Sequence, residues 1–297
     1  MYNRSMQKSL KGKLLEKVLK IVGAKKLYEH KQYLALQEKL NAKDVVPPVT
    51  CRRMWQKNTL GGFCYFESPG NDLLVLYTHG GAFVSGPNLF HWLFLKKLHK
   101  ATGATMVFPI YPKAPAFDHK QAYEFLLELC EHIAQKHPNK TLVFAGDSAG
   151  GNIALSLAWQ LKQKQLTSPE KLILFSPCID LTLTASEIEQ LEKDDVDPML
   201  SKAGLAIMYD CWAKGTPLDN PVLSPIFAPL NGLGKTLLFV GTNEILYPEN
   251  LAFANKAKEQ GVDVELVVGQ GQNHAWPLHP IAESKIAFEK IELFLKK

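Results

Sequence analysis

The sequence predicts an α/β fold in which a mostly parallel central sheet is flanked by helices and carries a helical cap. Three observations support this prediction: apolar runs alternate with helical stretches after residue 63, a basic amphipathic stretch precedes them, and one segment breaks the alternation. The 297 residues are 46% hydrophobic and 21% charged, which is an ordinary globular composition. This length suits one large domain with an appendage.

The first 48 residues predict a basic helical cap segment followed by a linker. Between residues 6 and 40, apolar side chains recur every four positions opposite lysines, at Leu10, Leu14, Val18 and Val22, with Leu15 and Leu19 beside them. We expect this stripe to pack on the body of the protein, and the alternative is peripheral contact with an anionic membrane. Pro47 and Pro48 exclude a helix from residues 41–48, which predicts the linker.

The formal net charge of +5 is unevenly distributed. Residues 1–31 hold nine basic and two acidic side chains and carry +7, whereas the other 266 residues hold 25 basic and 27 acidic ones and carry −2. The body therefore has no bias toward a polyanion, and we expect no nucleic-acid partner. Charged residues interrupt the apolar positions of residues 1–31, so neither a secretory signal nor a membrane-spanning segment is expected.

The cysteines and histidines give no sign of a disulfide framework or a metal site. The five cysteines lie at least 13 residues apart, and none belongs to a Cys-x-x-Cys pair. The nine histidines contain no His-Glu-x-x-His pattern. We therefore expect a cytoplasmic protein with no metal and no cofactor.

Residues 49–297 predict the main domain, built from alternating strands and helices. Mostly apolar runs predict strands at residues 73–77, 104–109, 141–145, 171–175, 235–240 and 262–268. Helical periodicity predicts helices at residues 88–102, 119–137, 152–164, 249–260 and 280–297. Residues 184–215 follow a strand without an immediate return strand, so we interpret them as a cap insertion over the carboxyl edge of the sheet.

Residues 146–150, Gly-Asp-Ser-Ala-Gly, fit the pattern G-x-S-x-G of a nucleophile elbow. The pattern alone is weak, but here it follows a predicted strand and opens a predicted helix, which is the setting that the elbow requires. The flanking glycines leave room for a strained backbone. We therefore predict Ser148 as a nucleophile, and we expect Asp147 to hydrogen-bond within the loop.

Residues 79–83, His-Gly-Gly-Ala-Phe, follow another strand at the same sheet edge. Consecutive glycines let backbone N–H groups turn toward a carbonyl oxygen, as an oxyanion hole requires. Ala149, directly after the nucleophile, is expected to supply a further N–H. We expect His79 to order this loop.

A serine nucleophile needs a base and a carboxylate that orients the base. Glu244 follows the strand that ends at Val240, and His274 follows the run that ends at Val268, so both fall on carboxyl-edge loops. The order Ser148, Glu244, His274 is that of an α/β-hydrolase. His279 is the nearest competing base.

These motifs resemble the hormone-sensitive-lipase-type branch of the α/β-hydrolases. The resemblance covers roughly residues 70–297 and rests on HGGAF (79–83), GDSAGG (146–151), DNPVLSP (219–225), VGTNEIL (240–246) and NHAW (273–276). It implies a carboxylesterase or lipase with cap segments. It further implies Ser148 as nucleophile, His274 as base and Glu244 as acid. The oxyanion donors that it implies are Gly80, Gly81 and Ala149.

Three positions depart from the family's pattern. Ala82 replaces a frequent third glycine, Glu244 stands where many members have Asp, and the common Tyr-Arg-Leu-Ala-Pro-Glu becomes Tyr-Pro-Lys-Ala-Pro-Ala at residues 111–116. The backbone donors are kept, and the longer Glu244 carboxylate can still reach the imidazole.

The sequence therefore predicts a serine carboxylesterase for short- to medium-chain acyl esters. One alternative is an amide hydrolase or deacetylase that uses the same residues. Another is a non-catalytic binder on this scaffold, like the plant gibberellin receptors, although those lack a complete triad. Phe83, Trp212 and Trp276 are candidates to line an apolar substrate pocket, and a role in core or cap packing is the alternative for each.

Overall fold

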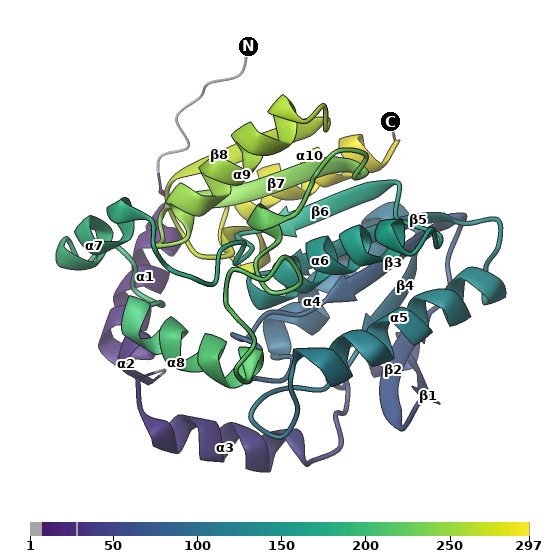
Figure 1. Cartoon of the computed structure of the whole chain (residues 1–297), viewed down its shortest axis with the longest axis horizontal. Helices are drawn as coiled ribbons and strands as arrows, with labels where there is room; N and C mark the ends of the chain where they lie inside the picture. Colours follow the sequence, from purple (N-terminus) through teal and green to yellow (C-terminus); the bar gives the residue numbers. More distant parts are fainter. Residues whose placement is uncertain (1–7, 28, 297) are drawn as a thin grey trace.

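A computed structural model describes residues 8–27 and 29–296 and shows an eight-stranded sheet with helices on both faces (Figure 1). The strand order is β1-β2-β4-β3-β5-β6-β7-β8. The strands are β1 (Gln56–Leu60), β2 (Phe63–Ser68), β3 (Leu73–Thr78), β4 (Thr105–Pro109), β5 (Thr141–Asp147), β6 (Lys171–Phe175), β7 (Lys235–Asn243) and β8 (Val264–Asn273). All pairs from β4 to β8 are parallel, so the predicted mostly parallel sheet is confirmed.

The hairpin of β1 and β2 is the part of the sheet that the sequence did not predict. These two strands pair antiparallel with each other, and β2 pairs antiparallel with β4. The side chains of β1 are mostly exposed and polar, because this strand lies at the sheet edge. An apolar run therefore could not mark it. Gly61 and Gly62 both have positive φ and form the turn.

The helices of the main domain cover the two sheet faces in separate groups. They are α4 (Leu89–Thr102), α5 (His119–Lys136), α6 (Ala149–Gln163), α9 (Tyr247–Glu259) and α10 (Ser284–Lys296). The core on one face contains side chains from α4 and α10, and the core on the other contains side chains from α5, α6 and α9. In β5, Phe144 belongs to one core and Val143 to the other, as expected for a strand buried on both faces.

The cap consists of five helices that gather beside one end of the sheet (Figure 1). They are α1 (Leu10–Val22), α2 (Ala24–Leu27), α3 (Lys31–Asn41), α7 (Ser186–Lys193) and α8 (Lys202–Ala213). Gly23 adopts a left-handed conformation with φ 66° and ends α1. The two helices α7 and α8 occupy the predicted insertion at residues 184–215.

One expectation about the cap is wrong. The apolar stripe of α1 does not pack on the body as a whole, because Leu10, Leu14, Val18 and Val22 are exposed. The half-buried Leu15 and Leu19 and the buried Gly12 face the body instead.

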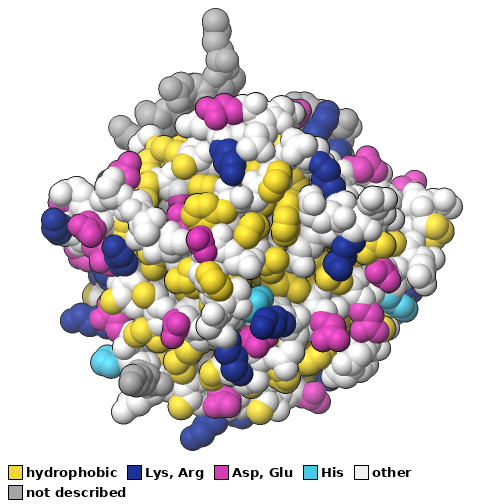
Figure 2. All heavy atoms as spheres, viewed as in Figure 1, with side chains coloured by type: hydrophobic (Ala, Val, Ile, Leu, Met, Phe, Trp, Pro, Cys, Tyr) yellow, Lys and Arg dark blue, Asp and Glu magenta, His cyan; other side chains and the backbone are white. Residues whose placement is uncertain are grey.

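Charged side chains of both signs are interspersed among apolar ones on the face that carries α5, α6 and α9 (Figure 2). This distribution fits the small net charge of the body. Among the helices formed by residues 8–27 and 29–296, none has the length and apolar character needed to cross a bilayer.

Three further helical turns complete the described chain: η1 (Arg52–Met54), η2 (Pro225–Phe227) and η3 (Trp276–Leu278). The turn η3 begins two residues after His274 and packs against α10 and α4. These contacts hold the segment after β8 against the two helices.

Candidate active site

Ser148 lies at a sharp turn between the end of β5 and the start of α6. Its backbone has φ 53° and ψ −124°, a strained conformation for a residue with a side chain. The turn depends on its glycines, because a Cβ on Gly150 would lie 2.1 Å from the carbonyl oxygen of Thr78. The N–H of Ser148 donates to the oxygen of Phe175 over 2.9 Å. This geometry is the predicted elbow, and it directs Ser148 into a cavity of about 350 Å³.

His274 and Glu244 meet at the carboxyl ends of β8 and β7. The Nδ1–H of His274 donates to Glu244 Oε2 over 2.7 Å, and the N–H of Gly241 donates to the other carboxylate oxygen over 2.9 Å. Both side chains are almost fully buried. Because Nδ1 is occupied, Nε2 is the nitrogen left to face the cavity that His274 shares with Ser148. The Ser148 hydroxyl itself is 3.8 Å from Cys178 Sγ.

The surroundings of His274 favour the protonated imidazole. Burial alone lowers the pKa of His274, but the hydrogen bond and the charge of Glu244 outweigh it, with help from the charges of Asp197 and Asp147. The pKa of His274 is therefore raised above its ordinary value of 6.5. A raised pKa makes the imidazole a stronger base once it is neutral.

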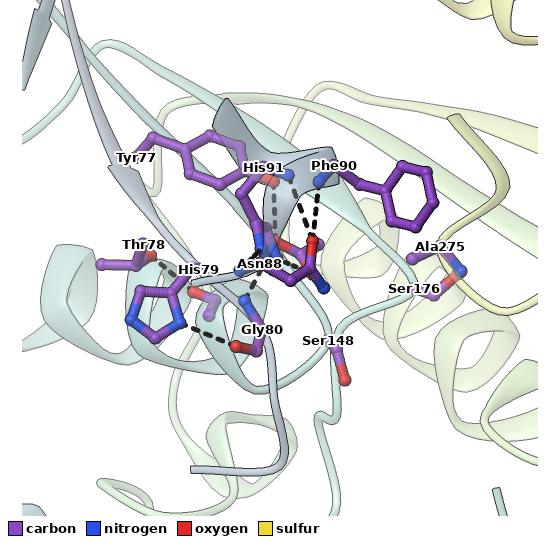
Figure 3. A network of polar contacts seen from close by, with 12 residues as sticks. Tyr77, Thr78, His79, Gly80, Asn88, Phe90, His91, Ser148, Ser176 and Ala275 are labelled. Atoms are coloured by element: carbon purple, nitrogen blue, oxygen red, sulfur yellow. Dashed lines mark hydrogen bonds and ion pairs between the residues drawn. The ribbon is translucent and has the colours of Figure 1, made fainter. Parts of the chain in front are cut away.

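Asp147 anchors the glycine loop to the elbow. Its carboxylate accepts hydrogen bonds from Tyr77 Oη (2.7 Å) and the N–H of Gly80 (3.0 Å), and it lies 3.2 Å from His91 Nε2. Burial opposes the ionised form, but these partners prevail and lower the pKa of Asp147 to about 2. Gly80 and His91 lie near Ser148 in this network (Figure 3). The expected loop role of Asp147 fits these contacts.

The contact with Asp147 corrects one expected oxyanion donor. The N–H of Gly80 already donates to the Asp147 carboxylate, so it is not free to bind a substrate oxygen. Gly81 has φ +119°, and a Cβ there would lie 2.8 Å from Ser85 O, so this position requires glycine. The N–H of Ala149 is the first of α6, where helix N–H groups have no partner within the helix. Gly81 and Ala149 therefore remain as the candidate donors.

His79 orders the glycine loop, as expected. Its ring stacks on Tyr111 with centroids 4.5 Å apart, and its Nδ1 lies 2.7 Å from the oxygen of Gly80. The hydroxyl of Tyr111 donates to the oxygen of His79 over 2.8 Å. His79 is fully buried, which lowers its pKa well below the ordinary value. It therefore lies outside the catalytic cavity and supports its wall.

His279 also lines the cavity but is held differently from His274. Its Nε2–H donates to the backbone oxygen of His274 over 3.0 Å, and no carboxylate among the described residues pairs with it. Burial lowers the pKa of His279 to about 4. The structure therefore pairs the carboxylate with His274, the base preferred in the sequence.

Comparisons with known proteins agree with this geometry. A family model described as "alpha/beta hydrolase fold" matches residues 75–278. The chain is 32% identical to an esterase of Acinetobacter venetianus over 210 residues. The aligned region covers 68% of this chain and 69% of the esterase. A solved hormone-sensitive-lipase homologue from a metagenome library is 25% identical, with a TM-score of 0.83 over 98% of this chain and 99% of that one.

The chain belongs to the hormone-sensitive-lipase-type branch of the α/β-hydrolases. It is a carboxylic ester hydrolase, like the relatives that it matches. A crystal structure of a putative esterase from Staphylococcus aureus is also similar, with 28% identity and a TM-score of 0.85 over 90% of this chain and 92% of that one.

The aromatic residues expected to line the substrate pocket of this esterase belong to the core instead. Phe83 stacks on Trp212 of the cap helix α8, with centroids 4.7 Å apart within the core, and Trp276 packs on Phe239. All three are fully buried and none borders the catalytic cavity. The cavity is lined instead by other side chains, among them Tyr33, Gln37, Phe90, Met199, Leu200 and Leu278.

Asp197 is a buried acid of the esterase that the sequence analysis missed. It accepts hydrogen bonds from the N–H groups of Met199 and Leu200, which line the cavity, and from the N–H of Ile245, next to Glu244. Burial raises the pKa of Asp197 to about 6, against the charge of His274 and these hydrogen bonds. Asp197 thus links the inserted cap to the loop that carries Glu244. Asp197 lies in a charged stretch without regular periodicity, so the sequence did not indicate this role.

Proposed function

We propose that this esterase is a serine carboxylesterase that acts through a covalent acyl-enzyme on Ser148. The contact of 2.7 Å between Glu244 and His274, the latter lining the same cavity as Ser148, is the observation that carries the proposal. Glu244 fixes the tautomer in which Nε2 of His274 can accept a proton.

Catalysis begins when Ser148 Oγ attacks the ester carbonyl carbon and His274 Nε2 takes the hydroxyl proton. The carbonyl oxygen becomes an oxyanion, which the N–H groups of Gly81 and Ala149 stabilise, together with the N-terminus of α6. His274 then protonates the leaving alcohol as the carbon–oxygen bond breaks. Water repeats these steps, with His274 as base, and releases the carboxylic acid and free Ser148.

The preferred substrates in this proposal are esters with short to medium acyl chains. The catalytic cavity of about 350 Å³ is near the small end of the range for ligand pockets. Tyr33 and Gln37 of α3 and Met199 of the inserted segment border it, so both cap segments limit its size. The five cysteines are free thiols, which supports the cytoplasmic location that we propose.

Replacing Ser148 with Ala tests the proposed nucleophile. We expect the thermal unfolding temperature to change little and the hydrolysis of p-nitrophenyl butyrate to fall by at least about 10³-fold. Cys178→Ala, which changes the nearest sulfur and leaves the nucleophile, is the matched control and should keep most activity. Near-wild-type turnover by Ser148→Ala would contradict the proposal.

A series of p-nitrophenyl esters from C2 to C16 tests the chain-length proposal. We expect kcat/KM to peak at short to medium chains, and a maximum at C16 would contradict this. Matched ester and amide substrates then separate an esterase from an amide hydrolase, because an amide leaving group requires protonation that an activated ester does not.

A further inference from the structure

The helix α1 turns a row of large apolar side chains toward solvent. Their exposed fractions are 85% for Leu10, 63% for Leu14, 46% for Val18, 84% for Ile21 and 63% for Val22. Spacings of three and four residues place them on one side of the helix. We call this row the α1 face. It contrasts with the opposite side, where the buried Gly12 meets the body.

The α1 face is held in place by contacts near both ends of the helix. Glu283 accepts hydrogen bonds from the N–H and the hydroxyl of Ser9, over 2.6 and 2.9 Å. Beyond the other end, Lys25 Nζ lies 3.3 Å from the carboxylate of Asp195. The helix that carries the apolar row is therefore fixed within the cap, where Figure 1 shows it beside α2 and α7.

Lysines surround this face and leave it strongly positive. Residues 8–27 contain seven lysines and one acid, Glu16, which gives a net charge of +6. Lys11, Lys13 and Lys17 are exposed, and none forms an ion pair within the described part of the chain. A second copy of the chain would bring the same positive charge to the contact and repel it. A bilayer with anionic lipid offers the opposite charge and an apolar interior.

We propose that the α1 face docks on membranes that contain anionic lipid. In this arrangement Leu10, Leu14 and Ile21 enter the boundary between headgroups and acyl chains, and the flanking lysines contact anionic headgroups. The proposal does not depend on the catalytic function, since it concerns binding alone.

Docking through this face would also set the catalytic cavity near the lipid. Lys8 Nζ donates to Asn273 Oδ1 over 2.7 Å, and Asn273 precedes His274. Beyond the other end of α1, Lys25 contacts Asp195, and Met199, a few residues after Asp195, lines the cavity. The helix therefore lies alongside the cavity. If the proposed ester hydrolysis holds, substrates dissolved in the bilayer would be close to the entrance.

Vesicle cosedimentation of the full chain tests the proposal. The Ser148→Ala variant is used, so that hydrolysis by the proposed nucleophile does not change the lipid during the measurement. We expect binding to phosphatidylcholine vesicles with about 30 mol% phosphatidylglycerol, and at least tenfold weaker binding without the anionic lipid. High salt should weaken the binding, because it screens exposed charges.

Paired substitutions identify the surface. Leu14→Ser with Val18→Ser should weaken vesicle binding at least tenfold, and Lys13→Gln with Lys17→Gln should weaken it on anionic vesicles. Leu293→Ser is the matched control, because Leu293 is 60% exposed on α10, and it should bind like the parent. Unchanged binding of the α1 variants would overturn the proposal. A dimer that the α1 substitutions convert to a monomer would overturn it in favour of self-association.

A separate observation concerns a second cavity, of about 600 Å³, between α3, the β1–β2 hairpin and the loop after β4. Lys113 lines it and is almost fully buried. Its ammonium donates to the oxygen of Tyr111 over 2.9 Å and forms no ion pair among the described residues. Burial lowers the pKa of Lys113 to about 8. A buried cation without an anionic partner is costly, and a bound anion would offset that cost.

The other walls of this cavity are mostly apolar. They include Val45, Phe63, Ile110, Pro112, Ala116 and Phe117. Its charged rim is balanced, because Glu38 and Asp44 oppose Lys43 and Lys57. The uncompensated charge is therefore that of Lys113. From this combination we infer that the second cavity binds a carboxylate with an apolar chain, such as a medium-chain fatty acid, with its carboxylate at Lys113.

Calorimetric titration of the Ser148→Ala protein with decanoate tests this second inference. Lys113→Met should weaken binding at least tenfold and raise the unfolding temperature, because it removes an unpaired buried charge. Lys57→Met at the rim should leave decanoate affinity within about twofold. Equal affinity in the Lys113→Met protein would overturn the inference, because decanoate would then bind elsewhere. The KM of Lys113→Met for p-nitrophenyl acetate, measured with Ser148 intact, should match wild type.

Discussion

The nucleophile elbow and α1 differ in how completely the protein constrains them. At the elbow, Ser148 is strained, its N–H is bonded to Phe175, and Asp147 is buried with three partners. Along α1, one side is held and the other exposes five large apolar residues. The difference is the one expected if packing fixes the proposed reacting groups while the exposed side of α1 serves the proposed contact with lipid.

The largest effect should come from removing the proposed general base of the constrained region. His274→Ala removes the proton acceptor, so we expect kcat/KM for p-nitrophenyl butyrate to fall by about 10⁴-fold. His279→Asn changes the other histidine of the cavity and should cost tenfold at most. Steady-state kinetics of the two variants provide the measurement. Comparable losses in both would remove the distinction between the two histidines.

A smaller effect should follow from loosening the support behind the elbow. Asp147→Asn removes a buried charge that holds Tyr77, Gly80 and His91, so we expect a loss of about 2 kcal/mol or more in the free energy of unfolding. Urea denaturation measures this loss, and kcat should fall as Gly81 becomes less well placed. An unchanged unfolding midpoint would show that the loop is held by other contacts.

The same carboxylate gives a direction for pH dependence. Because the pKa of Asp147 is about 2 in the fold and 3.8 ordinarily, its ionised form stabilises the protein above pH 3.8. This contribution is lost as the pH falls through about 2. Wild type should therefore lose its stability advantage over Asp147→Asn in this acid range.

The smallest effect is expected at the unconstrained face. Leu14→Ser changes a side chain that is 63% exposed, so the free energy of unfolding should change by no more than about 0.5 kcal/mol. Leu155→Ala in buried α6 should cost about 2–5 kcal/mol. A large loss from Leu14→Ser would mean that the α1 face is covered in solution.

Burial on both faces made most of the fold predictable. Strands such as β5 and β6 are buried on two sides, so they appear in the sequence as apolar runs, and their bounds agree with those expected within about two residues. The hairpin of β1 and β2 was missed because an edge strand needs no such run. For α1, periodicity predicted an amphipathic helix, but it could not say which side meets the body.

The residues that carry local backbone geometry were also predictable, and those that depend on tertiary contacts were not. The glycines around Ser148 mark the elbow directly in the sequence. That the N–H of Gly80 points to Asp147 depends on two loops meeting. The aromatic residues Phe83 and Trp212 were assigned to the pocket because sequence does not separate a cavity wall from a core stack. Asp197 acts through backbone N–H groups, which leave no sequence pattern.

The most direct test of the central claim is covalent labelling by a p-nitrophenyl alkylphosphonate, followed by mass spectrometry. One adduct on the peptide that contains Ser148 should appear in step with the loss of esterase activity. Because the pKa of His274 is raised, the labelling rate should decline in acid with a midpoint above 6.5. Full activity in labelled protein, or an adduct on another residue, would contradict the acyl-enzyme mechanism on Ser148.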